Sequence, residues 1–234
     1  MKGLKICGVS DPKTLNYILN HNQKPTMIGF ITNYEKSRRF VEYEKLKELI
    51  NVDKKNINFV SVLVNPNDEI LEKIKDLNFD YYQLYDVSPE RTRIIKEIKP
   101  IKIISAITID EKKDVNNYKE YLNLSEIILF DGKGYEKSIG FDHDLLNDLP
   151  NSINKMIAGD IKIEDIPILT RNASLSKHHI RMLNGEAFFV TVISAKKNEK
   201  NNVTDTVSKA FGVLHGGDPK IEIIAKQLEK ISQT

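Results

Sequence analysis

NFVSVLVNPNDEILEKI, residues 58–74, contains one complete strand, turn and helix. Residues 58–64 are mostly apolar and β-branched, as expected of a parallel strand that is buried on both faces. Asn67 can cap a helix whose apolar stripe passes through Leu71 and Ile74. The stretch therefore predicts a βα unit, in which a buried strand is followed by an amphipathic helix.

The same pattern recurs along the chain. Asp11 and Ser88 are each followed by a proline, which is favourable at the first position of a helix. A final helix is expected over residues 219–232, where apolar residues recur at helical spacing. Eight strands are expected, at Leu4–Cys7, Met27–Ile31, Asn58–Val64, Tyr81–Leu84, Lys102–Ala106, Ile127–Phe130, Lys155–Ala158 and Phe188–Ile193.

Eight βα units in 234 residues indicate an α/β fold, a (β/α)8 TIM barrel in which residues 1–234 form a single domain. A doubly wound open sheet is the alternative, but no G-x-G-x-x-G follows the first strand, so a dinucleotide site has no support. Residues 195–214 are polar and irregular, and we expect them to form a surface excursion.

The composition limits the possible partners. Hydrophobic residues make up 40% and charged residues 29% of the chain, and the net charge is only +2, which is typical of a soluble globular protein without affinity for nucleic acid. No apolar run is long enough to span a membrane, and the N-terminus does not resemble a signal peptide. The single cysteine excludes an internal disulfide and favours a cytoplasmic location.

In a barrel, chemistry takes place at the carboxyl ends of the strands. Cys7 ends the first strand, where a thiolate can act as a proton acceptor or a nucleophile, or the residue can simply fill the core. Asp131 follows four apolar residues, so burial would raise its pKa and suit it to general acid catalysis. Alternatively, Asp131 caps the turn that follows.

Two further polar residues lie near strand ends. Gln83 ends the fourth strand and can hydrogen-bond a substrate. Arg39, beyond the second strand, can bind a carboxylate or phosphate, or it is a solvated loop arginine, which is the more common case. Metal binding is not expected, because the neighbouring residues in Asp142-His143-Asp144 and His178-His179 do not converge on one ion. We interpret the first of these stretches as a helix start, and HGGD at 215–218 as a turn.

Taken together, these residues resemble the phosphoribosylanthranilate isomerase family of tryptophan biosynthesis. The resemblance covers about the first 160 residues. The matching stretches are KICGVSDP at 5–12, MIGFITNYEKSRRFV at 27–41, VSVLVN at 60–65, YYQLYD at 81–86, IILFDGKGYEKSIGFDHDLL at 127–146 and KMIAGD at 155–160.

The resemblance implies an Amadori rearrangement of N-(5-phosphoribosyl)anthranilate to an aminoketose, without a cofactor or metal. It implies that Asp131 protonates the ring oxygen of the sugar, that Cys7 removes the proton from C2, and that Arg39 holds the anthranilate carboxylate. The expected partner is a phosphorylated small molecule, with no nucleic acid or membrane partner, and the expected assembly is a monomer or homodimer.

This chain also departs from the family pattern. The family sequence Q-L-H-G keeps Gln83 here but has Tyr85 and Asp86 in place of His and Gly. In the family, backbone amides after strands 7 and 8 bind the substrate phosphate. The corresponding residues here are Gly159, Asp160 and Ser194, with Asp160 replacing a glycine.

Two other interpretations follow from these departures. A non-catalytic, degenerate barrel of the same family would keep the fold with a weakened phosphate site. An enzyme acting on another phosphorylated sugar would share the fold, but it lacks specific sequence support. Retention of both proton-transfer groups favours a working isomerase.

Overall fold

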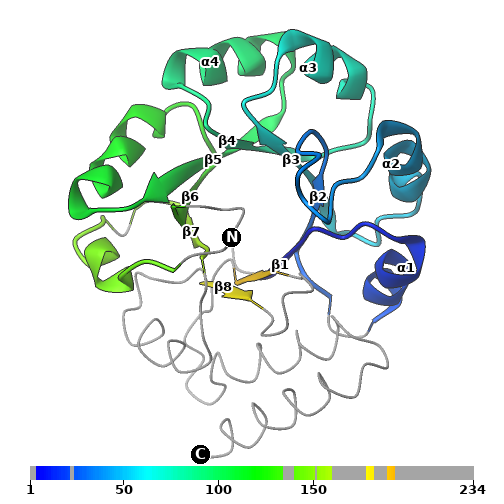
Figure 1. Cartoon of the computed structure of the whole chain (residues 1–234), viewed down its shortest axis with the longest axis horizontal. Coiled ribbons are helices and arrows are strands. Elements are labelled where there is room, and N and C mark those ends of the chain that lie inside the picture. The colour runs from blue at the N-terminus through cyan, green and yellow to red at the C-terminus, as the bar shows by residue number, and fades with distance from the viewer. Residues whose placement is uncertain are drawn as a thin grey trace, which may run out of the picture.

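The computed structural model describes residues 4–21, 24–133, 140–150 and 152–159, together with the backbone of 178–181 and 189–192. Its parallel strands form a curved sheet, and helices α1–α4 lie on the outside of the curve (Figure 1). The predicted helix at 219–232 and the surface excursion at 195–214 lie outside the described residues.

In the described part of the chain, seven strands run parallel and pair in the order of the sequence, from β1 to β7. All seven coincide with predicted strands, although β4, β5 and β6 continue beyond the predicted ends. The strands are β1 (Leu4–Cys7), β2 (Met27–Ile31), β3 (Asn58–Val64), β4 (Tyr81–Tyr85), β5 (Lys102–Ile109), β6 (Ile127–Gly132) and β7 (Lys155–Ile157).

The helices begin at the predicted capping residues. The side chains of Asp11, Asn67 and Ser88 each accept a hydrogen bond from a backbone N–H in the first turn of their helix. Asp142 caps a short 3-10 helix, as interpreted from the sequence. The helices are α1 (Pro12–Asn20), α2 (Tyr43–Ile50), α3 (Asp68–Ile74), α4 (Pro89–Ile98), η1 (Lys112–Tyr121) and η2 (His143–Leu146).

The eighth predicted strand differs from the prediction in its direction. β9 (Phe189–Val192) pairs antiparallel with β1, and β8 (His178–Arg181), which was not predicted, pairs antiparallel with β9. Only residues 182–188 connect β8 to β9. A parallel crossover needs a dozen or more residues, so a connection of this length requires an antiparallel pair.

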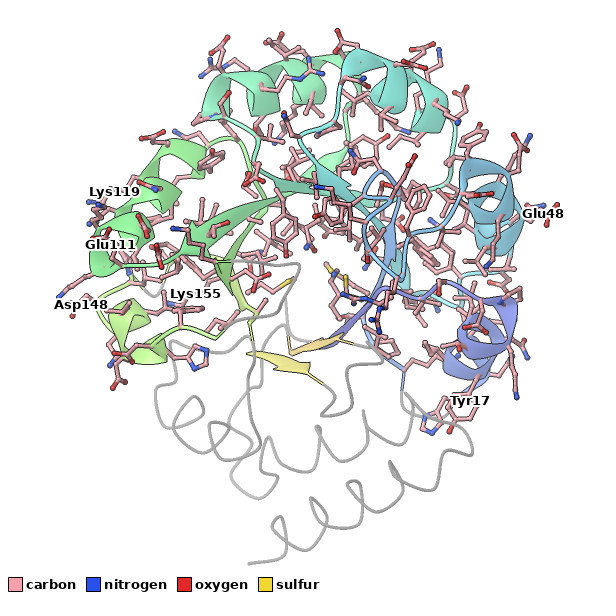
Figure 2. The ribbon with its side chains drawn as sticks, in the orientation of Figure 1. Tyr17, Glu48, Glu111, Lys119, Asp148 and Lys155 are labelled. Carbon is pink, nitrogen blue, oxygen red and sulfur yellow. The ribbon has the colours of Figure 1, made fainter. Side chains whose placement is uncertain are left out.

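Two apolar layers lie on opposite faces of the parallel sheet. The outer layer contains strand residues such as Phe30 and Phe59 together with helix residues such as Leu15 and Leu46. The inner layer contains strand residues and the residues directly after strands, but no residue of the described helices, so it fills the inside of the curve. Figure 2 shows side chains projecting from both faces of the sheet.

The described helices are all too short or too polar to cross a membrane.

Candidate active site

Side chains alternate along a strand, so only every second residue points to the inside of the barrel. Cys7 and Tyr85 belong to the inner apolar layer, at the carboxyl ends of β1 and β4. Asp131 lies near the end of β6 and contacts Tyr85, so it also faces inward. Cys7 and Asp131, the two residues expected to transfer protons, therefore both face the inside of the barrel.

Asp131 is a buried carboxyl group. It is 6% exposed, lies within β6 and contacts Tyr85, so its contacts are not limited to the turn that follows. Burial raises the pKa of Asp131 to about 6, because the charged form loses its hydration. Hydrogen bonds from Tyr85 and the Gly132 backbone, and the charges of Lys5 and Arg39, lower this pKa and oppose the effect of burial. The carboxyl group can therefore carry a proton near neutral pH.

Tyr85 connects Asp131 to Gln83. The Tyr85 hydroxyl donates to Oδ2 of Asp131 at 2.7 Å, and Nε2 of Gln83 donates to the same hydroxyl oxygen at 3.2 Å. Burial raises the pKa of Tyr85 well above 10, and the Asp131 charge raises it further. Oε1 of Gln83 is buried and has no hydrogen-bond partner within the described part of the chain.

Lys5 is a buried cation beside the cysteine, and no role was predicted for it from the sequence. It is 1% exposed and lies two residues before Cys7, on the same face of β1. A Cβ atom added at Gly29 would come within 2.8 Å of both Sγ of Cys7 and Nζ of Lys5. Gly29 therefore makes room for the thiol and the ammonium to lie next to each other. A lysine in the middle of an apolar strand was the available sequence signal.

Arg39 is held against the end of β1. Its Nη1 atom donates to the backbone carbonyl of Cys7 at 3.2 Å. Its side chain also lies over Gly8, where an added Cβ would come within 2.5 Å of the arginine Cδ. Gly8 has a φ of +86°, a conformation that favours glycine. The loop after β1 thus fixes the arginine beside the cysteine.

Gly159 begins the predicted phosphate loop after β7. It is buried and has a φ of +96°, so the chain turns there through a conformation that suits glycine. Asp160 and Ser194, the other two residues predicted to bind phosphate, lie outside the described residues, as do residues 215–218.

A family model and known protein sequences both match most of this chain. Residues 4–176 match a family model described as N-(5'phosphoribosyl)anthranilate (PRA) isomerase. The N-(5'-phosphoribosyl)anthranilate isomerase of Rhizobium etli (strain CIAT 652) is 30% identical to this chain over 172 residues, which cover 70% of this chain and 76% of that protein.

Solved structures show the same architecture. Phosphoribosyl anthranilate isomerase from Thermotoga maritima matches with a TM-score of 0.62 at 22% identity, over 72% of this chain and 82% of that one. A phosphoribosyl anthranilate isomerase in complex with reduced 1-(o-carboxyphenylamino)-1-deoxyribulose 5-phosphate matches with a TM-score of 0.58 at 22% identity, over 70% and 78%. The predicted (β/α)8 barrel fold is thereby confirmed.

The burial of Asp131 predicts a pH-dependent effect on stability. Its folded-state pKa of about 6 lies above the usual 3.8, so its contribution to stability is lost as pH rises from about 4 through 6. Asp131→Asn removes the buried charge, and it should raise the free energy of unfolding above that of the wild type by up to about 3 kcal/mol at pH 8. Urea denaturation at pH 5 and pH 8 measures this difference.

Asp148→Asn is the matched control, because the Asp148 side chain is 89% exposed and points away from the barrel (Figure 2). In this variant, the free energy of unfolding should differ between pH 5 and pH 8 by the same amount as in the wild type. A wild-type protein and an Asp131→Asn variant of equal stability at pH 8 would contradict the buried-carboxylate assignment.

Proposed function

Because the chain belongs to the N-(5'-phosphoribosyl)anthranilate isomerase family, we propose that it converts N-(5'-phosphoribosyl)anthranilate to 1-(o-carboxyphenylamino)-1-deoxyribulose 5-phosphate. This is an Amadori rearrangement in tryptophan biosynthesis, in which an aminoaldose becomes an aminoketose. The observation that carries the proposal is the buried carboxyl group of Asp131. It lies on the inner face of the sheet, as the Cys7 thiol does. No finding favours the non-catalytic alternative.

Asp131 acts first, as the general acid. Its protonated carboxyl group donates a proton to the ring oxygen of the ribose, and the bond from that oxygen to C1 breaks. The nitrogen lone pair then forms a C1=N double bond, which gives an open-chain Schiff base. A pKa of about 6 leaves a useful fraction of the carboxyl group protonated near neutral pH, which supports this role.

Cys7 acts second, as the general base. Its sulfur removes the proton from C2, and the electrons of that bond move towards the Schiff base nitrogen to give an enolamine. Addition of a proton to C1 and loss of the proton from the C2 hydroxyl then yield the ketone at C2. The Lys5 ammonium lies beside the sulfur and stabilises negative charge there. The Schiff base accepts the electrons, so the proposed reaction uses no metal or cofactor.

Arg39 and Gln83 bind the substrate in this proposal. The Arg39 guanidinium lies at the end of β1, where its Nη1 donates to the carbonyl of Cys7, and we propose that it also binds the anthranilate carboxylate. The buried Oε1 atom of Gln83 can accept a hydrogen bond from a sugar hydroxyl.

The phosphate site is proposed at the backbone amides of Gly159 and Asp160 after β7, with Ser194 contributing from beyond β9. The positive φ of Gly159 supports a tight turn at this place. The carboxylate of Asp160 would repel a phosphate dianion if it pointed inward, so we propose that it turns away from the mouth and caps a following helix.

The wider assignments follow the same proposal. We expect residues 1–234 to fold as one domain in the cytoplasm, as a monomer or homodimer.

The direct test of the function is complementation of a tryptophan auxotroph that lacks this isomerase. Growth with the wild-type gene, and no growth with the gene for Cys7→Ala, is the expected result. Failure of the expressed wild-type protein to support growth or turnover would contradict the proposal.

Removal of either proton-transfer group should abolish nearly all turnover. Asp131→Asn and Cys7→Ala should each reduce kcat by on the order of 10²–10⁴-fold, because a positioned acid or base contributes about that much. Steady-state isomerase assays measure the loss, and circular dichroism checks that the fold is intact. A rate near that of the wild type in either variant would mean that the wrong residue was assigned.

Arg39 and its neighbour Arg38 form a matched pair for testing carboxylate binding. Arg39 is half-buried against β1, whereas Arg38 is exposed. Arg39→Ala should raise KM by about 10- to 100-fold, because it removes a charge-assisted hydrogen bond. Arg38→Ala should leave KM within about twofold of the wild-type value. Equal effects of the two changes would argue for a general electrostatic role.

Asp160→Gly tests the phosphate loop. The change removes a negative charge and restores the glycine of the family pattern, so affinity for the substrate should stay the same or improve. Calorimetric titration with the product measures this affinity. Loss of activity would give Asp160 an active role, whereas binding that appears only in the variant would favour the non-catalytic alternative.

A further inference from the structure

We propose that Tyr85 is a positioning residue for the general acid, because its hydroxyl holds Oδ2 of Asp131 and leaves Oδ1 to carry the proton that the substrate receives. This inference rests on the proposed function for the identity of the reaction. It assigns a role to a residue that stands where the family pattern has histidine.

The hydrogen bonds of Tyr85 fix the direction of its hydroxyl. Its single proton is donated to Oδ2 of Asp131 at 2.7 Å, and its oxygen accepts from Nε2 of Gln83 at 3.2 Å. Gln83 and Tyr85 are neighbours on the inner face of β4, and both are less than 10% exposed. Three buried side chains from two strands therefore form one continuous chain of hydrogen bonds that ends at the acid.

The position of the acidic proton follows from this chain. A phenolic hydroxyl that donates to Oδ2 can do so whether or not Oδ1 carries a proton. The Tyr85 contact therefore survives when Asp131 releases its proton, and it strengthens when the carboxylate becomes charged. Gln83 keeps the hydroxyl turned towards Asp131 in both states. Proton release then requires no rearrangement of these three side chains.

Among the residues that the structure describes, the other charged and titratable groups around Asp131 come from β1 and from the segment after β2. They are Lys5, Cys7 and Arg39, and the charges of Lys5 and Arg39 both favour the ionised carboxylate. The hydrogen bond from Tyr85 also lowers the pKa of Asp131, whereas burial raises it. Loss of the Tyr85 hydroxyl should therefore raise the pKa of Asp131.

A tyrosine has an advantage over a histidine as the donor to this acid. Burial raises the pKa of Tyr85 well above 10, so its hydroxyl remains a neutral donor throughout the range in which Asp131 titrates. An ordinary histidine titrates near pH 6.5 and would change its own charge in the same range. With tyrosine, the hydrogen-bond donor to Asp131 stays neutral while the acid titrates.

The test compares Tyr85→Phe with Tyr82→Phe. Tyr82 is a buried tyrosine on the same strand that belongs to the outer layer, and its hydroxyl has no partner within the described residues. The carboxyl carbon-13 signal of Asp131, assigned by its absence in Asp131→Asn, is titrated in each full-length protein without substrate. Tyr85→Phe should raise the pKa of Asp131 by about one pH unit, and Tyr82→Phe should leave it unchanged.

The pH dependence of kcat/KM gives the second measurement. A general acid must be protonated, so kcat/KM falls as pH rises through its pKa. Tyr85→Phe should shift this alkaline limb of the profile to higher pH by about one pH unit. Tyr85→His retains a ring donor, so its alkaline limb should lie at or below that of the wild type. If Tyr85→Phe folds poorly, the Tyr85→His titration still tests the direction of the shift.

The two measurements separate this inference from the proposed function. An unchanged Asp131 titration in Tyr85→Phe, or a rate loss that is equal at every pH, would overturn the positioning role even in an active enzyme. An inactive wild-type protein would overturn the proposed function, and the titration does not depend on that result.

Discussion

The alternation of side chains along parallel strands determines which residues meet at the centre of this molecule. On β1, β4 and β6, residues two apart share a face, so Lys5 and Cys7 point inward together, as do Gln83 and Tyr85. A shift of one residue in the pairing of β4 would turn Tyr85 towards the helices and separate it from Asp131. The position of the acid therefore depends on the register of the sheet as much as on the acid itself.

Burial of charge at this centre has an energetic cost that the apolar layers offset. Asp131 and Lys5 are less than 10% exposed, and removing such groups from water is unfavourable unless they gain partners. The Tyr85 hydroxyl is one partner of Asp131, and the charges of Lys5 and Arg39 also favour its ionised form. The outer apolar layer packs the helices against the sheet, and the inner layer accommodates charged groups that reduce stability.

Much of the fold could be predicted from the sequence, because its signals are local. An apolar run followed by a capping residue, as at Asn67 or Ser88, specifies a strand and a helix start without distant information. The same apolar runs place Cys7 and Asp131 at the carboxyl ends of their strands. The direction of β9 could not be predicted in this way, because an apolar run has the same pattern in parallel and antiparallel strands. The contact between Tyr85 and Asp131 links residues 46 positions apart, and only the register of three strands reveals it.

The pairing of β1 with β9 has a consequence for how the chain folds. Each parallel strand from β1 to β7 pairs with the next in sequence, so this part of the sheet can grow as the chain is synthesised. β1 acquires its second partner only when Phe189–Val192 has been made. Until then, one edge of β1 presents unpaired backbone groups next to Cys7. This edge stays open to pairing with another chain for as long as the rest of the sheet is being made, and a chaperone that binds extended segments could cover it during that time.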